Sequence, residues 1–232
     1  MDPEQLKAVF NKLAAGYEQQ ITKLAPIHAG LYFQLEWIFA DLQQNARIMC
    51  VGLGTGKELS YLANKFPNWQ FTAIEPSAAM LNLCRQRAEK EGFISRCQFH
   101  NGYVESLDDS KPYDAATCFM VSQFILNNEQ RSYFFRAIAK KLKPKGILVS
   151  ADLSSEVGSA EYNALLKIWA AMLNVGKVPV DTIEKLGSAL ARDVAILAPS
   201  TVESIIKQGG FDSPVQFYQA SLVHAWFALR AK

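Results

Sequence analysis

Three glycines and one acidic residue are the residues best suited to bind a ligand. Gly52, Gly54 and Gly56 directly follow a short apolar run over residues 48–51. Glycines permit tight turns with positive φ and let main-chain N–H groups approach a ligand closely. Glu75 lies nineteen residues after Gly56, and a carboxylate at such a position can accept hydrogen bonds from the hydroxyls of a ribose. The pattern therefore predicts a nucleoside site.

A strand, a turn, a helix and a second strand must position these residues. Apolar residues recur at helical spacing over residues 57–66, and residues 71–74 are expected to form a second strand that ends at Glu75. The N-terminus of the helix after the glycines favours negative or electron-rich groups. This order of elements predicts the nucleoside-binding half of a doubly wound α/β fold.

Two other glycine-rich nucleotide motifs do not fit. The dinucleotide pattern G-x-G-x-x-G requires a third glycine where this chain has Lys57. The P-loop requires four residues between its first glycine and Gly-Lys, followed by Ser or Thr. Here Val51 stands at the first glycine position and Glu58 at the hydroxyl position.

The turn G-x-G-x-G followed by Glu75 resembles class I S-adenosylmethionine-dependent methyltransferases. Residues 113–116, Tyr-Asp-Ala-Ala, resemble the start of the family's fourth strand, and residues 142–150 resemble its connection into the fifth strand. The resemblance runs over nearly the whole chain in order. It implies S-adenosylmethionine as cofactor, S-adenosylhomocysteine as product and a small-molecule methyl acceptor. For the glycines alone, a plain turn without a ligand is the alternative.

The resemblance also implies which residues contact the cofactor. Tyr17 belongs to a helical cap, and either contacts the methionine end of the cofactor or packs on its own helix face. Met120, Val121 and Gln123 follow the fourth strand, and ligands of open α/β sheets lie beyond the carboxyl ends of the strands. The remaining expected contacts are Gly52, Leu53, Gly54, Thr55, Gly56, Glu75, Pro76, Met80, Gly102, Tyr103 and Val104.

Two positions depart from the family pattern. Cys50 stands where related enzymes have an acid that helps to hold the amino group of the cofactor. Weaker binding, a compensating contact from Tyr17 or the insertion, or a modified cofactor would each explain Cys50. Tyr103 replaces an acid that accepts from the adenine amino group. Its ring can stack on or close over the purine, while backbone groups of Tyr103 and Val104 serve the polar contact.

The sequence identifies no catalytic base. A sulfonium methyl group is already activated, so the protein must mainly hold the acceptor in line and exclude water, with a base for a weakly acidic nucleophile. Among the three histidines only His28, in the expected cap, is a candidate near the substrate. Arg192 in the expected insertion is a candidate for a carboxylate contact. A packing or surface role is the simpler interpretation of both.

The pattern of elements predicts one domain over residues 1–232. We expect a helical cap over 1–45, a cofactor-binding core over 46–152, a helical insertion over 153–198, and a last helix with a C-terminal β-hairpin over 199–232. The expected sheet is seven-stranded, doubly wound and mostly parallel, with an antiparallel last strand. The later helices are expected over 78–91, 129–142, 162–172, 181–190 and 201–208, and the later strands over 97–100, 115–120, 147–151, 214–219 and 222–230.

The composition is that of an ordinary soluble globular protein. Half of the 232 residues are hydrophobic, one fifth are charged, and the formal net charge is +2. No apolar run reaches the length of a membrane span, and the start of the chain lacks a signal pattern. The four cysteines include no C-x-x-C pair, which favours reduced thiols in the cytoplasm. We expect no membrane, nucleic-acid or metal site; a homodimer is left open.

Three other functions are alternatives for this nucleoside site. The layout is also similar to carboxy-S-adenosylmethionine synthase, which alters the cofactor rather than transferring its methyl group. A non-catalytic S-adenosylmethionine-binding module is a further alternative, motivated by Cys50, Tyr103 and the missing base. An NAD-dependent oxidoreductase is the third alternative.

Overall fold

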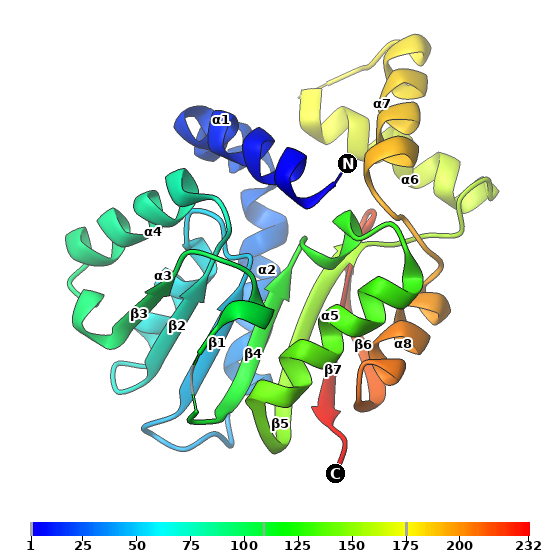
Figure 1. Ribbon diagram of the computed structural model, residues 1–232. Helices are drawn as coiled ribbons and strands as arrows, with labels where there is room; N and C mark the ends of the chain where they lie inside the picture. Colours follow the sequence, from blue (N-terminus) through cyan, green and yellow to red (C-terminus); the bar gives the residue numbers. More distant parts are fainter. Residues whose placement is uncertain (1, 109, 175) are drawn as a thin grey trace.

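The computed structural model describes residues 2–108, 110–174 and 176–232. Seven strands form one sheet in the order β3-β2-β1-β4-β5-β7-β6 (Figure 1). The strands are β1 (Arg47–Val51), β2 (Gln70–Ile74), β3 (Cys97–His100), β4 (Tyr113–Phe119), β5 (Leu142–Leu153), β6 (Phe211–Ala220) and β7 (Val223–Arg230).

The strand directions confirm the predicted fold class. Strands β3, β2, β1, β4 and β5 are mutually parallel, and β7 runs antiparallel between β5 and β6. A parallel sheet needs helical crossovers, which cover both of its faces. Ser221, in the turn between β6 and β7, has a φ of 54°, as a tight hairpin link requires.

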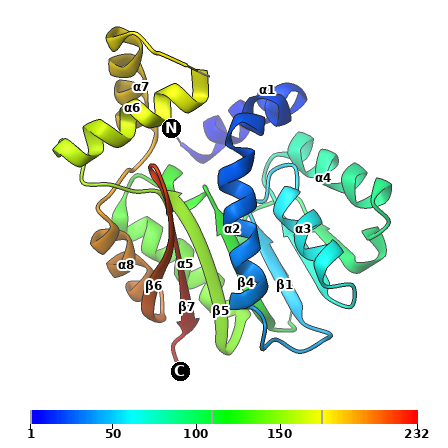
Figure 2. The same ribbon diagram turned by 180° about the vertical axis from the view of Figure 1, so that it is seen from behind.

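Helices cover both faces of the sheet (Figures 1 and 2). One face packs against α5 and α8, and the other against α2, α3 and α4. The helices are α1 (Pro3–Ile21), α2 (Ala25–Ile38), α3 (Lys57–Lys65), α4 (Ala78–Lys90), α5 (Asn128–Lys141), α6 (Ala160–Asn174), α7 (Val180–Asp193) and α8 (Pro199–Gln208), with 3₁₀ turns η1 (Thr22–Leu24), η2 (Ile94–Arg96), η3 (Val104–Ser106) and η4 (Ser122–Phe124).

Neighbouring residues of β1 face opposite cores. Met49 and Val51 pack with α5 and α8, whereas Ile48 and Cys50 pack with the helices of the other face. This alternation follows from the two-residue period of a strand. It places Cys50 on the same face as α3, the helix that starts directly after the glycine turn.

The helix α1 lies over the carboxyl ends of the parallel strands (Figure 1). Polar contacts attach it at three points. The Asn11 Oδ1 atom accepts hydrogen bonds from Ser77 Oγ at 2.8 Å and Ala79 N at 3.2 Å. The Tyr103 hydroxyl donates to Pro3 O at 3.2 Å, and Glu18 pairs with Arg87. The predicted N-terminal helices thus cover the edge of the sheet where a ligand is expected.

The helices α6 and α7 pack together beside the same edge (Figure 1). Their apolar residues, including Leu166 and Trp169, join a cluster with Leu24 and Val223. Residues of the segment between β4 and α5, among them Met120, also pack against this cluster.

A buried ion pair fixes the turn after β4. The Arg131 and Asp152 side chains are fully buried, with Arg131 Nη2 3.0 Å from Asp152 Oδ2. The same carboxylate accepts hydrogen bonds from Ser122 Oγ at 2.6 Å and Gln123 N at 3.0 Å. Arg131 Nη1 also donates to Ala195 O at 3.2 Å. This network therefore joins α5, β5, η4 and the segment after α7.

Candidate functional site

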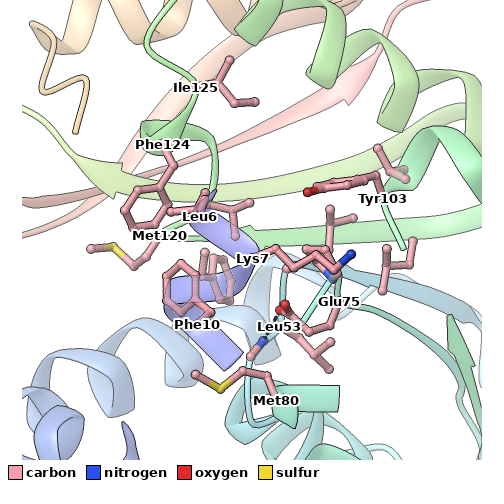
Figure 3. A pocket seen from close by; sticks show the side chains of 18 of the residues that line it. Leu6, Lys7, Phe10, Leu53, Glu75, Met80, Tyr103, Met120, Phe124 and Ile125 are labelled. Atoms are coloured by element: carbon pink, nitrogen blue, oxygen red, sulfur yellow. Dashed lines mark hydrogen bonds between the residues drawn. The ribbon is translucent and has the colours of Figure 1, made fainter. Parts of the chain in front are cut away.

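A cavity of about 740 Å³ opens at the carboxyl ends of β1, β2 and β4, beneath α1. Figure 3 shows Phe10, Met120 and Phe124 gathered on one side, Tyr103 on the opposite side and Glu75 between them. Most of the sequence-predicted contacts line this cavity: Tyr17, Gly52, Leu53, Gly54, Thr55, Glu75, Pro76, Met80, Gly102, Tyr103, Val104, Met120 and Val121. The location matches the crevice in which ligands of open α/β sheets bind.

The three motif glycines serve different purposes. A Cβ atom at Gly52 would lie 2.5 Å from the Val121 side chain, and one at Gly56 would lie 2.4 Å from Cys84 Sγ. Both glycines are therefore required by packing as well as by their positive φ. At Gly54, with a φ of 57°, the only atom of the described residues that a Cβ would meet within 4 Å is a ring carbon of Tyr17 at 3.9 Å. Gly54 therefore leaves its side of the turn open toward the cavity.

Glu75 is held by two main-chain donors. Its Oε2 accepts from Gly54 N at 3.0 Å, and its Oε1 accepts from Ser77 N at 2.8 Å. Burial raises the pKa of the Glu75 carboxyl, while these two hydrogen bonds act in the opposite direction. Each oxygen keeps further acceptor capacity, and the residue lines the cavity. A fixed carboxylate with free lone pairs suits a ligand that presents hydroxyl donors.

The loop after β3 forms the opposite wall. Asn101 Nδ2 donates to Glu75 O and Pro76 O, both at 3.0 Å, which joins this loop to the end of β2. Tyr103 contributes its ring to the cavity and its hydroxyl to the contact with α1. Tyr103 therefore connects the cap to the wall, a role that its sequence position alone does not reveal.

The turn after β4 contributes some of its predicted residues and not others. Met120 has a φ of 60°, in a region that few non-glycine residues adopt, and it lines the cavity with Val121. Gln123 lies outside the lining, because η4 turns its side chain toward β5, where its Oε1 accepts from Leu153 N at 2.7 Å. Gly56 also lies outside the lining. The expected direct contacts from these two residues are therefore not supported by their positions.

Polar residues from α1, α2 and α3 gather at one part of the cavity. Tyr17, His28, Tyr32, Lys57 and Glu58 all line it. Burial raises the pKa of Glu58 to about 7, although hydrogen bonds with Thr117 and Cys50 oppose the shift. Burial, and then the charge of Lys57, lower the pKa of His28, which favours its neutral form.

Sequence reasoning missed Glu58, Lys57 and Tyr32 as site residues. One signal was available for Glu58: it occupies the same face of α3 as Leu62, four residues later, and both are buried. A carboxylate on an apolar helix stripe is unusual, since charged residues are rarely buried without a partner. No comparable signal marks Tyr32, which reads as one more aromatic residue of an amphipathic helix.

Much of the rest of the lining is apolar, although Asp2, Lys7, Glu105, Asn127 and Gln130 also contribute to it. The apolar lining comes from the two N-terminal helices and from the segment after β4, and includes Leu6, Phe10, Ile21, Leu31, Phe119, Phe124, Ile125, Leu126 and Phe134. Phe10 and Phe124 meet edge to face with ring centroids 5.6 Å apart. The cavity therefore combines a polar part with a large apolar part.

The insertion lies behind this wall. None of residues 153–174 or 176–198 is among the lining residues, although α6 and α7 pack against Met120 and Phe124. Arg192 is exposed, and its guanidinium is bound by the neighbouring Asp193, with Nη2 2.6 Å from Oδ2. Of the two weaker substrate candidates, the structure brings His28 to the cavity and leaves Arg192 outside it.

No helix in the described ranges has both the length and the apolar character that crossing a membrane requires.

The chain is similar to known methyltransferases. Residues 48–146 match the family described as "Methyltransferase domain". The malonyl-[acyl-carrier protein] O-methyltransferase of Priestia megaterium is 26% identical over 171 residues, which cover 71% of this chain and 56% of that protein. The erythromycin 3''-O-methyltransferase of Saccharopolyspora erythraea is 26% identical over 117 residues, covering 49% of this chain and 37% of that protein.

Solved structures share the same fold. The mitomycin 7-O-methyltransferase structure superposes with a TM-score of 0.63 at 17% identity, covering 96% of this chain and 60% of that one. The chain therefore spans less than two thirds of the length of each of these three proteins.

Proposed function

The chain belongs to the class I S-adenosylmethionine-dependent methyltransferases, and from this premise we propose that it transfers the methyl group of S-adenosylmethionine to a small-molecule acceptor. The observation that carries the proposal is the junction of the Gly54 N–H and the Glu75 carboxylate, 3.0 Å apart, at the floor of the cavity. Glycine turns and acidic strand ends of this kind bind the ribose of nucleoside ligands.

The residues of the cavity fit such a cofactor. Gly54 presents no side chain toward the cavity, and Glu75 offers lone pairs to ribose hydroxyls. Pro76, Met80 and the Tyr103 ring supply apolar surface for a purine. When bound, the cofactor supplies a methyl group on a positively charged sulfur. The chain itself positions the acceptor beneath α1 and excludes water, and such positioning contributes roughly 7–11 kcal/mol in favourable cases.

We propose that the acceptor is a small, largely apolar molecule with an oxygen nucleophile. The apolar lining around Phe10, Phe119 and Phe124 supports the apolar class. The two sequence relatives named above are both O-methyltransferases and support oxygen as the acceptor atom. His28 lines the cavity with a lowered pKa, so a neutral imidazole is available to take a proton from a hydroxyl group.

Titration calorimetry with S-adenosylhomocysteine tests the cofactor assignment. We expect saturable 1:1 binding to the wild-type chain. The Glu75→Ala variant is expected to lose at least about tenfold in affinity, because hydrogen bonds to a charged acceptor contribute about 1.5–3 kcal/mol. Glu89→Ala, an exposed acid on α4, is the matched control and should bind as wild type does. Failure of the wild-type chain to bind at millimolar ligand would refute the proposal.

Turnover distinguishes an enzyme from a binding module. The chain is incubated with S-adenosylmethionine and a panel of apolar phenols, alcohols and carboxylic acids, and S-adenosylhomocysteine release is measured. Acceptor-dependent release is expected. Tight cofactor binding with no release on any acceptor would favour the non-catalytic module, and a carboxylated cofactor product would favour the carboxy-S-adenosylmethionine synthase type.

We further propose that the protein acts in the cytoplasm, supported by four cysteines that are all free. A homodimer is proposed only as an alternative to the monomer. Sedimentation analysis with and without cofactor distinguishes the two states.

A further inference from the structure

The end of β1 carries no charge where related enzymes hold the amino group of the cofactor. The Cys50 side chain is fully buried, and burial raises the pKa of its thiol, which keeps it neutral. On the neighbouring strand β4, Thr117 is the register partner of Cys50. These two side chains therefore form a neutral, polar floor between β1 and β4.

A carboxylate from α3 lies on that floor. Glu58 Oε1 accepts a hydrogen bond from Thr117 Oγ1 at 2.6 Å, and the Cys50 thiol is a second hydrogen-bonding neighbour of the same carboxyl. Only 4% of Glu58 is exposed, yet it lines the cavity. Glu58 therefore places an acid over Cys50 from the following helix instead of from the strand.

The start of α3 suits this placement. Gly56 is the N-cap, so Glu58 is the second residue of the helix. Carboxylates are stabilised in the first turn by free N–H groups and the helix dipole. The glycine turn is only two residues away, and so the acid and the turn share one edge of the cavity.

No cationic side chain in the described part of the chain neutralises the Glu58 carboxylate. The groups that face this part of the cavity are Tyr17 from α1, His28 and Tyr32 from α2, and Lys57 from α3. Within the described ranges, Glu58 forms no ion pair. A buried carboxylate without a counter-charge is costly. A ligand that brings its own ammonium group would supply that charge.

We propose that Glu58 binds the α-ammonium group of S-adenosylmethionine, replacing an acid that Cys50 does not provide. This inference rests on the proposed function. The competing explanation is purely structural: a protonated Glu58 that only connects α3 to β4 through Thr117. The two differ in what the ligand's amino group contributes, so a ligand without that group separates them.

Calorimetry compares S-adenosylhomocysteine with its analogue lacking the α-amino group. The wild-type chain is expected to prefer the natural ligand by at least about tenfold, the size of one charge-assisted hydrogen bond. In Glu58→Gln we expect this preference to disappear, because affinity falls for the natural ligand and stays unchanged for the analogue. Glu89→Gln, the exposed control, keeps the wild-type preference. Equal losses for both ligands in Glu58→Gln would overturn the inference.

Moving the acid back to the strand is the complementary test. In the double variant Cys50→Asp/Glu58→Gln, the preference for the amino group is expected to return at least in part. A double variant that folds, as judged by circular dichroism, and binds both ligands with equal affinity counts against the proposal.

The pH dependence of binding to the wild-type chain provides a third test, which needs no variant. The ratio of the two affinities should fall between pH 8 and pH 5.5, because the Glu58 carboxyl becomes protonated while the ligand's ammonium stays charged. A ratio that is constant over this range contradicts the inference. If the wild-type chain binds neither ligand, the proposed function fails; if it binds both equally at pH 8, only the role of Glu58 fails.

Discussion

Two buried carboxylates at the cavity, Glu58 and Glu75, differ in the donors that they receive. Glu75 accepts from two main-chain N–H groups, of Gly54 and Ser77. Glu58 accepts from a threonine hydroxyl and a thiol, which are weaker compensation for the loss of water. The neutral form of Glu58 is therefore easy to populate without ligand, as its pKa of about 7 indicates.

The Glu58 pKa predicts how stability depends on pH. The carboxyl titrates near 4.5 in an unfolded chain and at about 7 in the folded one. The folded state thus binds more protons between these values, and its stability falls as pH rises through that window. The loss is roughly 3 kcal/mol when complete, from about 1.4 kcal/mol per pKa unit.

Glu58→Gln removes this dependence. Urea unfolding without ligand should show the variant more stable than wild type at pH 8, with the difference approaching zero near pH 5. Glu89→Gln, an exposed acid, is expected to match wild type at both values. Parallel stability curves for Glu58→Gln and wild type would show that Glu58 ionises normally in the folded chain.

Two of the predicted contacts that line the cavity are fixed by strand ends. Glu75 and Val121 follow parallel strands, and such ends meet at one edge of a sheet. Gly56 was predicted from the glycine turn and Gln123 from the end of β4, but both lie outside the cavity lining. Spacing cannot distinguish a glycine that contacts a ligand from one, such as Gly56, that is required by close packing against Cys84. It also does not predict that η4 turns the Gln123 side chain toward β5.

At the scale of elements, a buried ion pair holds the wall between β4 and α5. Arg131 and Asp152 come from α5 and β5, and their contacts with Ser122 and Gln123 fix the turn that follows Met120. The apolar lining of the cavity starts at this turn. The ion pair therefore helps to fix the shape of the apolar part of the cavity, where we expect the methyl acceptor to bind.

Asp152→Asn tests that ion pair. The change leaves the Arg131 charge buried without its partner, which is expected to cost about 3–5 kcal/mol. Urea unfolding at pH 7 measures the loss. Asp181→Asn, which breaks the exposed pair with Lys185 on α7, should change stability by no more than about 1 kcal/mol. A cost for Asp152→Asn as small as that of the control would show that the buried pair contributes little.

Element boundaries were predicted closely where the pattern was periodic. The helix α3 spans Lys57–Lys65, as its apolar spacing indicated. The strand β5 was expected only over 147–151, because Pro144 and Gly146 are typical of a loop. In the structure it spans Leu142–Leu153. The bulge between Tyr113 and Ala115 of β4, and a positive φ at Lys145, accommodate Pro144 and Gly146 within the strand.

The insertion illustrates a limit of pattern reasoning. Its helices were predicted from their apolar faces. Amphipathic spacing identifies which face is buried but not the surface that buries it. The faces of α6 and α7 pack on the outside of the cavity wall, and the cap over the cavity comes from the other end of the chain.

At the scale of the whole molecule, the cavity lies between a rigid sheet and a lightly attached cap. Ala14 is the only residue of α1 that is buried. Its polar attachments are the contacts of Asn11, Glu18 and Pro3 described above. The strands β1 and β4, by contrast, are almost entirely buried. Regions with few buried contacts open locally at low free energy, so we expect α1 to detach before the sheet does.

Hydrogen exchange measures this difference directly. In the free chain, the amides of α1 should exchange much faster than those of β1 and β4. Saturating S-adenosylhomocysteine is expected to slow α1, because a ligand that contacts both cap and sheet stabilises the closed state by its differential affinity. Asn11→Ala, which removes the link to Ser77 and Ala79, should speed exchange in α1 and at the Ala79 amide, which loses its acceptor, whereas Lys12→Ala on the exposed side of α1 should not. Protection of α1 equal to that of β4 before ligand is added would mean that the cap is part of the rigid core, and that ligands enter elsewhere.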